Sequence, residues 1–179
     1  GLSSYGDCTI IVWFTVFDRT QSQCVFSFGY GDSETQSFVY IVPNPNLVTT
    51  TPKLSINNGT WLQLDDDVPN NVLIKACISI SGLTMNVKTY FNNTEQSKLF
   101  TLTSKPEINI KNRAFDLGGN SLNSLNKNCL NGSISYFAMW DKALSDAQIK
   151  YMVGYSPVSK DVVQSTDVVL FSDSHVTRT

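Results

Sequence analysis

The chain has little net charge, a single histidine and no long apolar run. Its 13 Lys and Arg residues nearly balance 15 Asp and Glu residues, so the formal net charge is −2. Nucleic-acid binding usually needs a concentrated positive field, which this composition does not supply. No stretch is apolar for long enough to cross a bilayer. We therefore expect neither a nucleic-acid partner nor a membrane span in this chain.

Residue patterns that support catalysis or zinc binding are missing too. Hydrolysis of a glycosidic bond needs two carboxyl groups roughly 5 to 9 Å apart, and no predicted strand carries such a pair. His175 has no serine or cysteine nucleophile in a triad-like context. The four cysteines include no C-x-x-C pair, which zinc sites commonly use. The sequence therefore predicts no catalytic residues and a protein that is not an enzyme.

The features that are present favour an extracellular or cell-surface glycoprotein. The cysteine count is even and three N-x-S/T sequons fall in predicted turns, a combination typical of secreted proteins. The alternative is a reduced protein with four buried thiols. The candidate disulfide cysteines are Cys8, Cys24, Cys77 and Cys129, and the candidate glycosylation sites are Asn58, Asn92 and Asn131.

Strand patterns dominate the chain. Residues 8–17 are β-branched and aromatic and are apolar on both faces, which indicates a central strand. Two hairpins are predicted, one joining 53–56 to 60–64 and one joining 72–80 to 84–91. Many strands at even spacing predict an all-β sandwich.

A late segment combines a strand with the only predicted helix. The Asn-Gly dipeptide at 131–132 predicts a tight turn, and residues 134–140 follow as a strand. Ser145 and Gln148 have the spacing of a capping box, which predicts a short helix near 146–153. The residues expected on one face of the strand are Ile134, Tyr136, Ala138 and Trp140.

In this order the segments resemble the laminin-G-like and pentraxin branch of the concanavalin A-like lectin/glucanase superfamily. The segments that carry the resemblance are Thr9-Ile10-Ile11-Val12-Trp13, Val25-Phe26-Ser27-Phe28, residues 73–79, residues 85–93, Met139-Trp140-Asp141, Leu144-Ser145 and Gln148-Ile149. The resemblance implies a jelly-roll sandwich of two antiparallel sheets. We expect one domain over 1–179, with its core at about 8–171 and a tail at 172–179. Because the chain begins with Gly1 rather than Met, we expect a mature chain or part of a larger one.

The resemblance also implies a function. It suggests a non-catalytic extracellular recognition or adhesion domain that binds a glycan or a protein through loops at one rim. The residues expected at this rim are Trp61, Asp65, Asp66 and Asp67, whereas Trp13 and Trp140 are expected in the core.

Cofactor and disulfide expectations follow from the same family. Pentraxins bind calcium through acidic and amide side chains, and the nearest equivalents here are Asp32, Glu34 and Asp116. The segment from 117 to 131 contains no Asp or Glu, although calcium prefers carboxylates, so we expect the calcium site to be absent and no cofactor to be needed. Of the three possible disulfide pairings, the resemblance favours Cys8–Cys77 with Cys24–Cys129.

An alternative function is a structural subunit of an extracellular glycoprotein assembly or filament. The usual first strand of the family is missing or reduced to residues 1–5. A sandwich without that strand would expose an edge, and an exposed edge can pair with a strand from another copy. Self-association through strand addition is therefore a second hypothesis.

Overall fold

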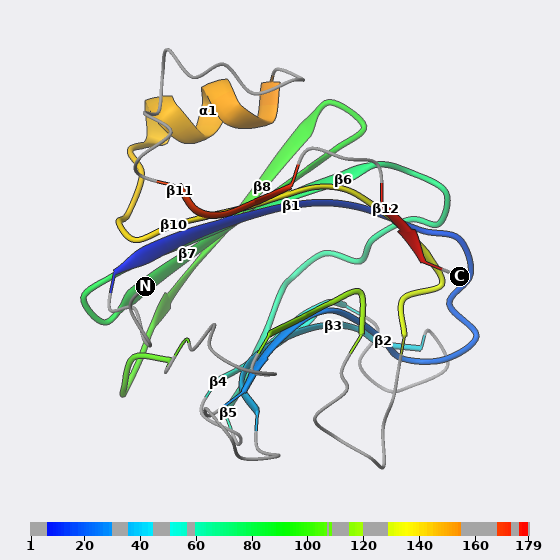
Figure 1. Cartoon of the computed structure of the whole chain (residues 1–179), viewed down its shortest axis with the longest axis horizontal. Coiled ribbons are helices and arrows are strands. Elements are labelled where there is room, and N and C mark those ends of the chain that lie inside the picture. The colour runs from blue at the N-terminus through cyan, green and yellow to red at the C-terminus, as the bar shows by residue number, and fades with distance from the viewer. Residues whose placement is uncertain are drawn as a thin grey trace.

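The computed structural model describes residues 7–29, 36–44, 51–56, 60–106, 108, 115–119, 129–154, 168–172 and 176–178. They form two antiparallel sheets stacked face to face, with one helix, α1 (Asp146–Gly154), on the outer face of the larger sheet (Figure 1). The strands of the larger sheet are β1 (Cys8–Val16), β6 (Ile74–Ser81), β7 (Thr84–Phe91), β8 (Thr94–Thr101), β10 (Gly132–Trp140), β11 (Val168–Ser172) and β12 (Val176–Arg178). The strands of the smaller sheet are β2 (Gln23–Gly29), β3 (Gln36–Val42), β4 (Lys53–Ile56), β5 (Thr60–Gln63) and β9 (Phe115–Leu117). The predicted all-β sandwich with one short helix is confirmed.

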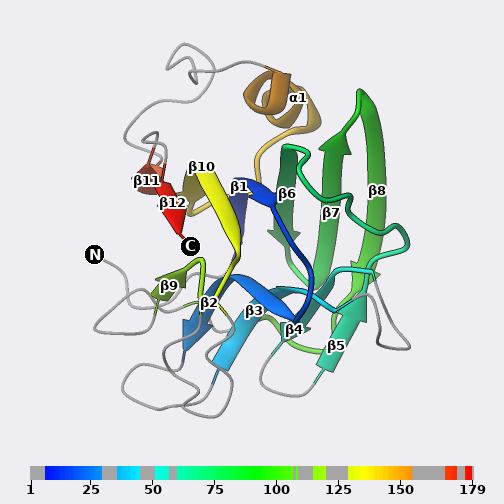
Figure 2. The ribbon, with the colours of Figure 1, turned by 90° about the vertical axis from the view of Figure 1, so that its right-hand side faces the viewer.

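Neighbouring strands are often distant in the sequence. The larger sheet runs β11-β10-β1-β6-β7-β8, with β12 also paired to β10, and the smaller sheet runs β5-β4-β3-β2-β9. Both predicted hairpins form, as β4 with β5 and as β6 with β7. The edge strands β5 and β8 lie on the same side of the sandwich (Figure 2). No helix among the described residues is long and apolar enough to cross a membrane.

The main core lies between the two sheets. On β1 the alternate residues Ile10, Val12 and Phe14 are fully buried against the smaller sheet. The Phe26 ring joins the layers, since its centroid lies 5.6 Å from that of Phe38 in its own sheet and 6.4 Å from that of Phe137 in the other. Full burial of such side chains contributes about 1.5 to 3 kcal/mol each.

A second apolar cluster lies on the outer face of the larger sheet, beneath α1. Its members are Ile11, Trp13, Cys77, Tyr136, Ala138, Trp140, Leu144, Ile149 and Met152. Because this cluster covers the face of β1 that points away from the smaller sheet, β1 is buried on both faces, as predicted. The same cluster confirms that Trp13 and Trp140 are core residues.

Local hydrogen bonds fix the start of α1. The Ser145 backbone N–H donates to Gln148 Oε1 at 2.9 Å, and the Gln148 N–H donates to Ser145 Oγ at 3.2 Å. This is the predicted capping box. The Thr9 hydroxyl donates to the Lys142 carbonyl and accepts from the Leu144 N–H, both at 2.9 Å. Thr9 therefore anchors the connection between β10 and α1 to the N-terminal end of β1.

The prediction for the faces of β10 was wrong at one residue. The register with β1 shifts between Trp13 and Phe14, whose partners are Tyr136 and Ile134, so Ser135 is an extra residue in a β-bulge. The bulge reverses the alternation and turns Ile134 into the main core. The predicted turn at Gly132 was also wrong, because Gly132 is the first residue of β10. Glycine is needed there since a Cβ would lie 1.8 Å from the Thr15 carbonyl oxygen.

The described C-terminal strands bear on two further predictions. Along β10, the side that does not pair with β1 pairs with β11 and β12, so no edge is exposed there. β1 and β10 are therefore not the exposed edge that a missing first strand was expected to leave, and self-association through strand addition stays a prediction. Residues 176–178, expected in a tail, form β12 within the sheet.

Candidate functional site

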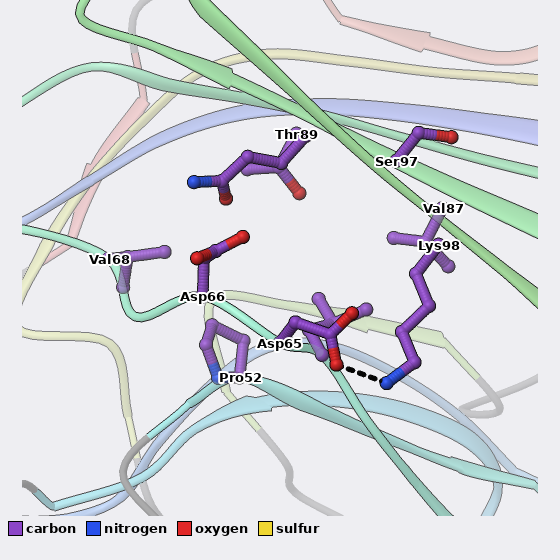
Figure 3. Close-up of a pocket in the computed structure, with 10 residues that line it drawn as sticks. Pro52, Asp65, Asp66, Val68, Val87, Thr89, Ser97 and Lys98 are labelled. Carbon is purple, nitrogen blue, oxygen red and sulfur yellow. Dashed lines mark hydrogen bonds and ion pairs between the residues drawn. The ribbon is translucent and has the colours of Figure 1, made fainter.

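A small pocket opens where the edges of the two sheets meet, between β8 and the loop that follows β5 (Figure 3). Its volume is about 30 Å³. The lining residues are Pro52, Leu64, Asp65, Asp66, Val68, Val87, Thr89, Gln96, Ser97 and Lys98. We call it the Asp66 pocket. It contains two of the rim residues that the sequence predicted, Asp65 and Asp66.

One wall of the Asp66 pocket comes from the inner face of β7 and β8. The register pairs Val87 with Lys98 and Thr89 with Gln96, and Val87 belongs to the main core. The other three side chains are therefore on the face that points toward the smaller sheet. The smaller sheet does not cover them because it ends at β5. Gln96 and Lys98 are thus partly exposed at inward positions, whereas Thr89 is buried.

The polar side chains of the pocket can both donate and accept hydrogen bonds. Asp65 forms an ion pair with Lys98, while the exposed Asp66 points across the pocket toward Thr89 (Figure 3). Two carboxylates and one ammonium give the lining a formal charge of −1. Carboxylate, amide and hydroxyl groups together match the alternating donors and acceptors of sugar hydroxyls.

Arg19 holds the loop that carries the acidic residues. Its side chain is only 5 % exposed, and its guanidinium donates to the Pro43 carbonyl from Nε at 3.1 Å and from Nη2 at 2.6 Å. Nη1 donates to the Val68 carbonyl at 3.2 Å and to Asp67 Oδ1 at 2.5 Å. Asp67 also accepts from the Val68 N–H at 2.9 Å. Asp67 therefore fixes the loop and is not part of the pocket lining.

The other predicted site residues lie elsewhere. Trp61 is 48 % exposed, but it is on β5, and its neighbour Leu62 packs against the main core, so Trp61 is on the outer face of the smaller sheet. The Lys53 ammonium lies 4.6 Å from the centroid of the Trp61 ring. Asp116 is on β9, opposite Ser27, whereas Asp32 and Glu34 lie outside the described residues. Within the described part of the chain, no three His, Cys, Asp or Glu side chains come together as a metal site.

The sequence interpretation missed the wall residues of the Asp66 pocket and Arg19. A signal for the wall was present, since Gln96 and Lys98 alternate with exposed residues on β8, where a fully covered strand would carry apolar residues. Arg19 gave no such signal, because the turn around it is polar and its partners lie 24 to 49 residues away.

All four cysteines are free thiols in the structure. Cys8 faces the main core and Cys77 faces the cluster under α1, so the two are on opposite sides of one sheet and the predicted bond between them was wrong. Burial raises the pKa of both thiols to about 12. Burial also raises the pKa of Cys24, with smaller contributions from Asp116 and Cys129. A bond between Cys24 and Cys129 stays a prediction.

Two of the three sequons are in the described part of the chain. Asn92 and Asn93 form the two-residue turn between β7 and β8 with φ values of 50° and 58°, and both are exposed. Asn131 is exposed as well, although its backbone N–H is bound to Gln23 Oε1 at 2.8 Å. Asn58 lies outside the described residues. Glycosylation at these positions stays a prediction.

Comparison with protein families supplies the identification. A laminin G family model, described as the concanavalin A-like lectin/glucanases superfamily, matches residues 2–150. The chain belongs to this superfamily. The resemblance drawn from the sequence is thereby confirmed. No curated protein matches the chain by sequence.

Solved structures share the fold of this superfamily member at low sequence identity. A Bacteroides ovatus protein, provisionally described as carbohydrate binding, has a TM-score of 0.69 at 11% identity over 96% of this chain; the chain spans 46% of that protein. The SAP-like pentraxin of Limulus polyphemus has a TM-score of 0.64 at 14% identity over 99% of this chain and 86% of the pentraxin. The CBM40 of a Ruminococcus gnavus sialidase, solved with α2,3-sialyllactose, has a TM-score of 0.60 at 15% identity over 80% of both chains. At these identities the likeness establishes the fold alone.

Proposed function

We propose that this superfamily member is a non-catalytic carbohydrate-recognition domain that works outside the cell, and that the Asp66 pocket binds a neutral sugar. The proposal rests on the polar groups on the inner face of β7 and β8, at the side where the smaller sheet ends. An inward face of a sandwich is normally apolar. Polar groups at that position are expected where a ligand, rather than the other sheet, covers them.

The size of the pocket limits what enters it. One water-sized group needs roughly 10 to 15 Å³, so a pocket of about 30 Å³ has room for about two hydroxyl groups. We infer that a sugar ring lies over the opening and directs two adjacent hydroxyls inward. Asp66 would accept from one of them, and Thr89 or Gln96 would bind the other.

The charge of the pocket favours neutral over acidic sugars. The lining carries Asp65, Asp66 and Lys98, and Asp65 already neutralises the lysine. The Asp66 carboxylate is thus left with no cationic partner in the pocket. It would repel a sugar carboxylate and attract hydroxyl donors, to which charge-assisted bonds are stronger than neutral ones.

A glycan array probed with the purified domain tests this function. We expect neutral glycans to be retained, and to be retained equally in calcium and in EDTA, because the contacts proposed need no metal. Retention of no neutral glycan would contradict the proposal. Loss of all retention in EDTA would also contradict it and would restore the calcium site that the pentraxin resemblance suggested.

A further inference from the structure

A second and larger hollow lies on the opposite face of the larger sheet, between the C-terminal end of α1 and the β7–β8 hairpin. Its volume is about 590 Å³. The lining residues are Leu73, Lys75, Tyr90, Phe91, Asn92, Asn93, Thr94, Glu95, Lys150, Val153 and Gly154. We call it the helix groove. It shares no residue with the Asp66 pocket, so ligand binding in the helix groove does not depend on that pocket.

Lys75 places a positive charge at the base of the helix groove. Its ammonium donates to the Val153 carbonyl at 2.6 Å and lies 4.3 Å from the centroid of the Trp13 ring. Among the described residues, no carboxylate lies within 4.0 Å of this ammonium. The half negative charge of a helix C-terminus offsets only part of a full positive charge. Lys75 therefore keeps a positive charge and hydrogen-bond donors for a further anionic partner.

Other polar groups of the groove are arranged around this charge. Lys150 is exposed at the rim and has no carboxylate within 4.0 Å among the described residues. Glu95 is the acidic residue of the lining, and its charge is partly balanced by Lys88 at 3.8 Å. The Tyr90 hydroxyl is buried; burial and then nearby Glu95 raise its pKa, yet no hydrogen bond of ordinary geometry joins the two. A protonated donor thus lines the groove together with the two lysines.

The groove also offers apolar and amide surface. Leu73 is 42 % exposed, which gives one apolar flank that can pack against the face of a ring, whereas the Phe91 side chain packs against the main core on the other side of the sheet. Asn92 and Asn93 present amide groups on the hairpin turn. An anionic group bound by lysines, an apolar flank and side-chain amides together match a hexose that carries a carboxylate.

We propose that the helix groove is a binding site for a carboxylate-bearing sugar residue, with Lys75 and Lys150 holding the carboxylate, Leu73 packing against the ring, and Asn93 bonding its hydroxyls. The site would give the domain opposite preferences on its two faces, neutral sugars in the Asp66 pocket and acidic sugars here. The competing role for Lys75 is only to cap the end of α1.

Two methyl glycosides that differ at a single group provide the test. Methyl β-D-glucuronide and methyl β-D-glucoside are each titrated into the ¹⁵N-labelled domain, and amide shifts are followed by NMR. We expect the glucuronide to shift amides of residues 91–95 and 150–154, and the glucoside to bind at least about tenfold more weakly, as expected for the loss of a charge-assisted bond. Equal binding of both sugars, or shifts confined to other residues, would overturn the proposal.

Substitutions then separate binding from capping. Lys150→Gln changes an exposed residue without touching the Val153 carbonyl, and Lys75→Gln keeps a donor for that carbonyl while removing the charge. We expect each to weaken glucuronide binding by about fivefold or more. Lys53→Gln, which removes a lysine on the other sheet, is the matched control and should leave binding unchanged. If neither Lys75→Gln nor Lys150→Gln alters glucuronide affinity, Lys75 is a helix cap only and the site is refuted.

Discussion

Replacement of Arg19 by methionine should destabilise the protein far more than replacement of its ionic partner. Arg19 is buried and donates to two backbone carbonyls, those of Pro43 and Val68, in addition to the Asp67 carboxylate. In Arg19→Met both carbonyls lose a charged donor, and each unsatisfied group costs about 1 to 3 kcal/mol. We expect a loss of about 3 kcal/mol in the free energy of unfolding.

Asp67→Asn is the matched comparison. The Asp67 side chain is 45 % exposed, so the charge of this pair is screened and contributes about 1 kcal/mol or less. Asparagine also keeps an oxygen for the Val68 N–H and for Arg19. The difference between the two variants therefore measures how much of the stabilisation comes from the carbonyl contacts rather than from the ion pair.

Urea unfolding followed by tryptophan fluorescence measures both variants, and thermal unfolding provides a second reading. For a chain of this size, 3 kcal/mol corresponds to a fall in Tm of roughly 6 to 12 °C. If the free energy of unfolding of Arg19→Met is within about 1 kcal/mol of the wild-type value, the carbonyl contacts do not hold the loop. The same conclusion follows if Asp67→Asn lowers the free energy of unfolding as much as Arg19→Met.

Three further predictions concern packing, capping and thiol reactivity. Gly132→Ala should cost more than about 3 kcal/mol or prevent folding, because its Cβ would overlap the Thr15 carbonyl; calorimetry of any soluble product would check this, and a near-native Tm would disprove the close approach of β1 and β10. Ser145→Ala should cost about 1 kcal/mol in urea unfolding by removing the acceptor for the Gln148 N–H, and an unchanged midpoint would mean the box is not formed in solution. In native protein at pH 8, iodoacetamide should modify Cys129 and spare the three buried cysteines. A buried thiol found labelled by mass mapping would contradict this prediction. An unlabelled Cys129, with two hydrogens missing from the intact mass, would reveal its predicted bond to Cys24.

Features set by neighbouring residues could be predicted from the sequence. The capping box depends only on Ser145 and Gln148, which are three residues apart, and both hydrogen bonds form. The hairpin joining 72–80 to 84–91 was also predicted from local patterns, and Gly82 in its turn has a φ of +60°. The two apolar faces of β1 also follow directly from alternation. Together these local signals were enough for the fold class.

Features set by distant contacts could not be predicted in this way. The bulge at Ser135 follows from the register between β1 and β10, more than 100 residues apart, and local alternation gives no sign of it. The opposite orientations of Cys8 and Cys77 likewise depend on how two strands pair. For the candidate site, the sequence indicated Asp65 and Asp66, but their partners on β7 and β8 became neighbours only through the stacking of the sheets.

Affinity for a neutral glycan, measured by isothermal titration with wild type, Asp66→Asn and Asp141→Asn, tests the central claim most directly. Asp141 is exposed and outside the pocket, so its substitution makes the same charge change without touching the site. We predict that Asp66→Asn weakens binding about tenfold, the value for loss of about 1.4 kcal/mol when a charge-assisted bond becomes neutral, and that Asp141→Asn binds like wild type. Equal affinity of all three proteins would contradict the assignment of the Asp66 pocket as the carbohydrate site.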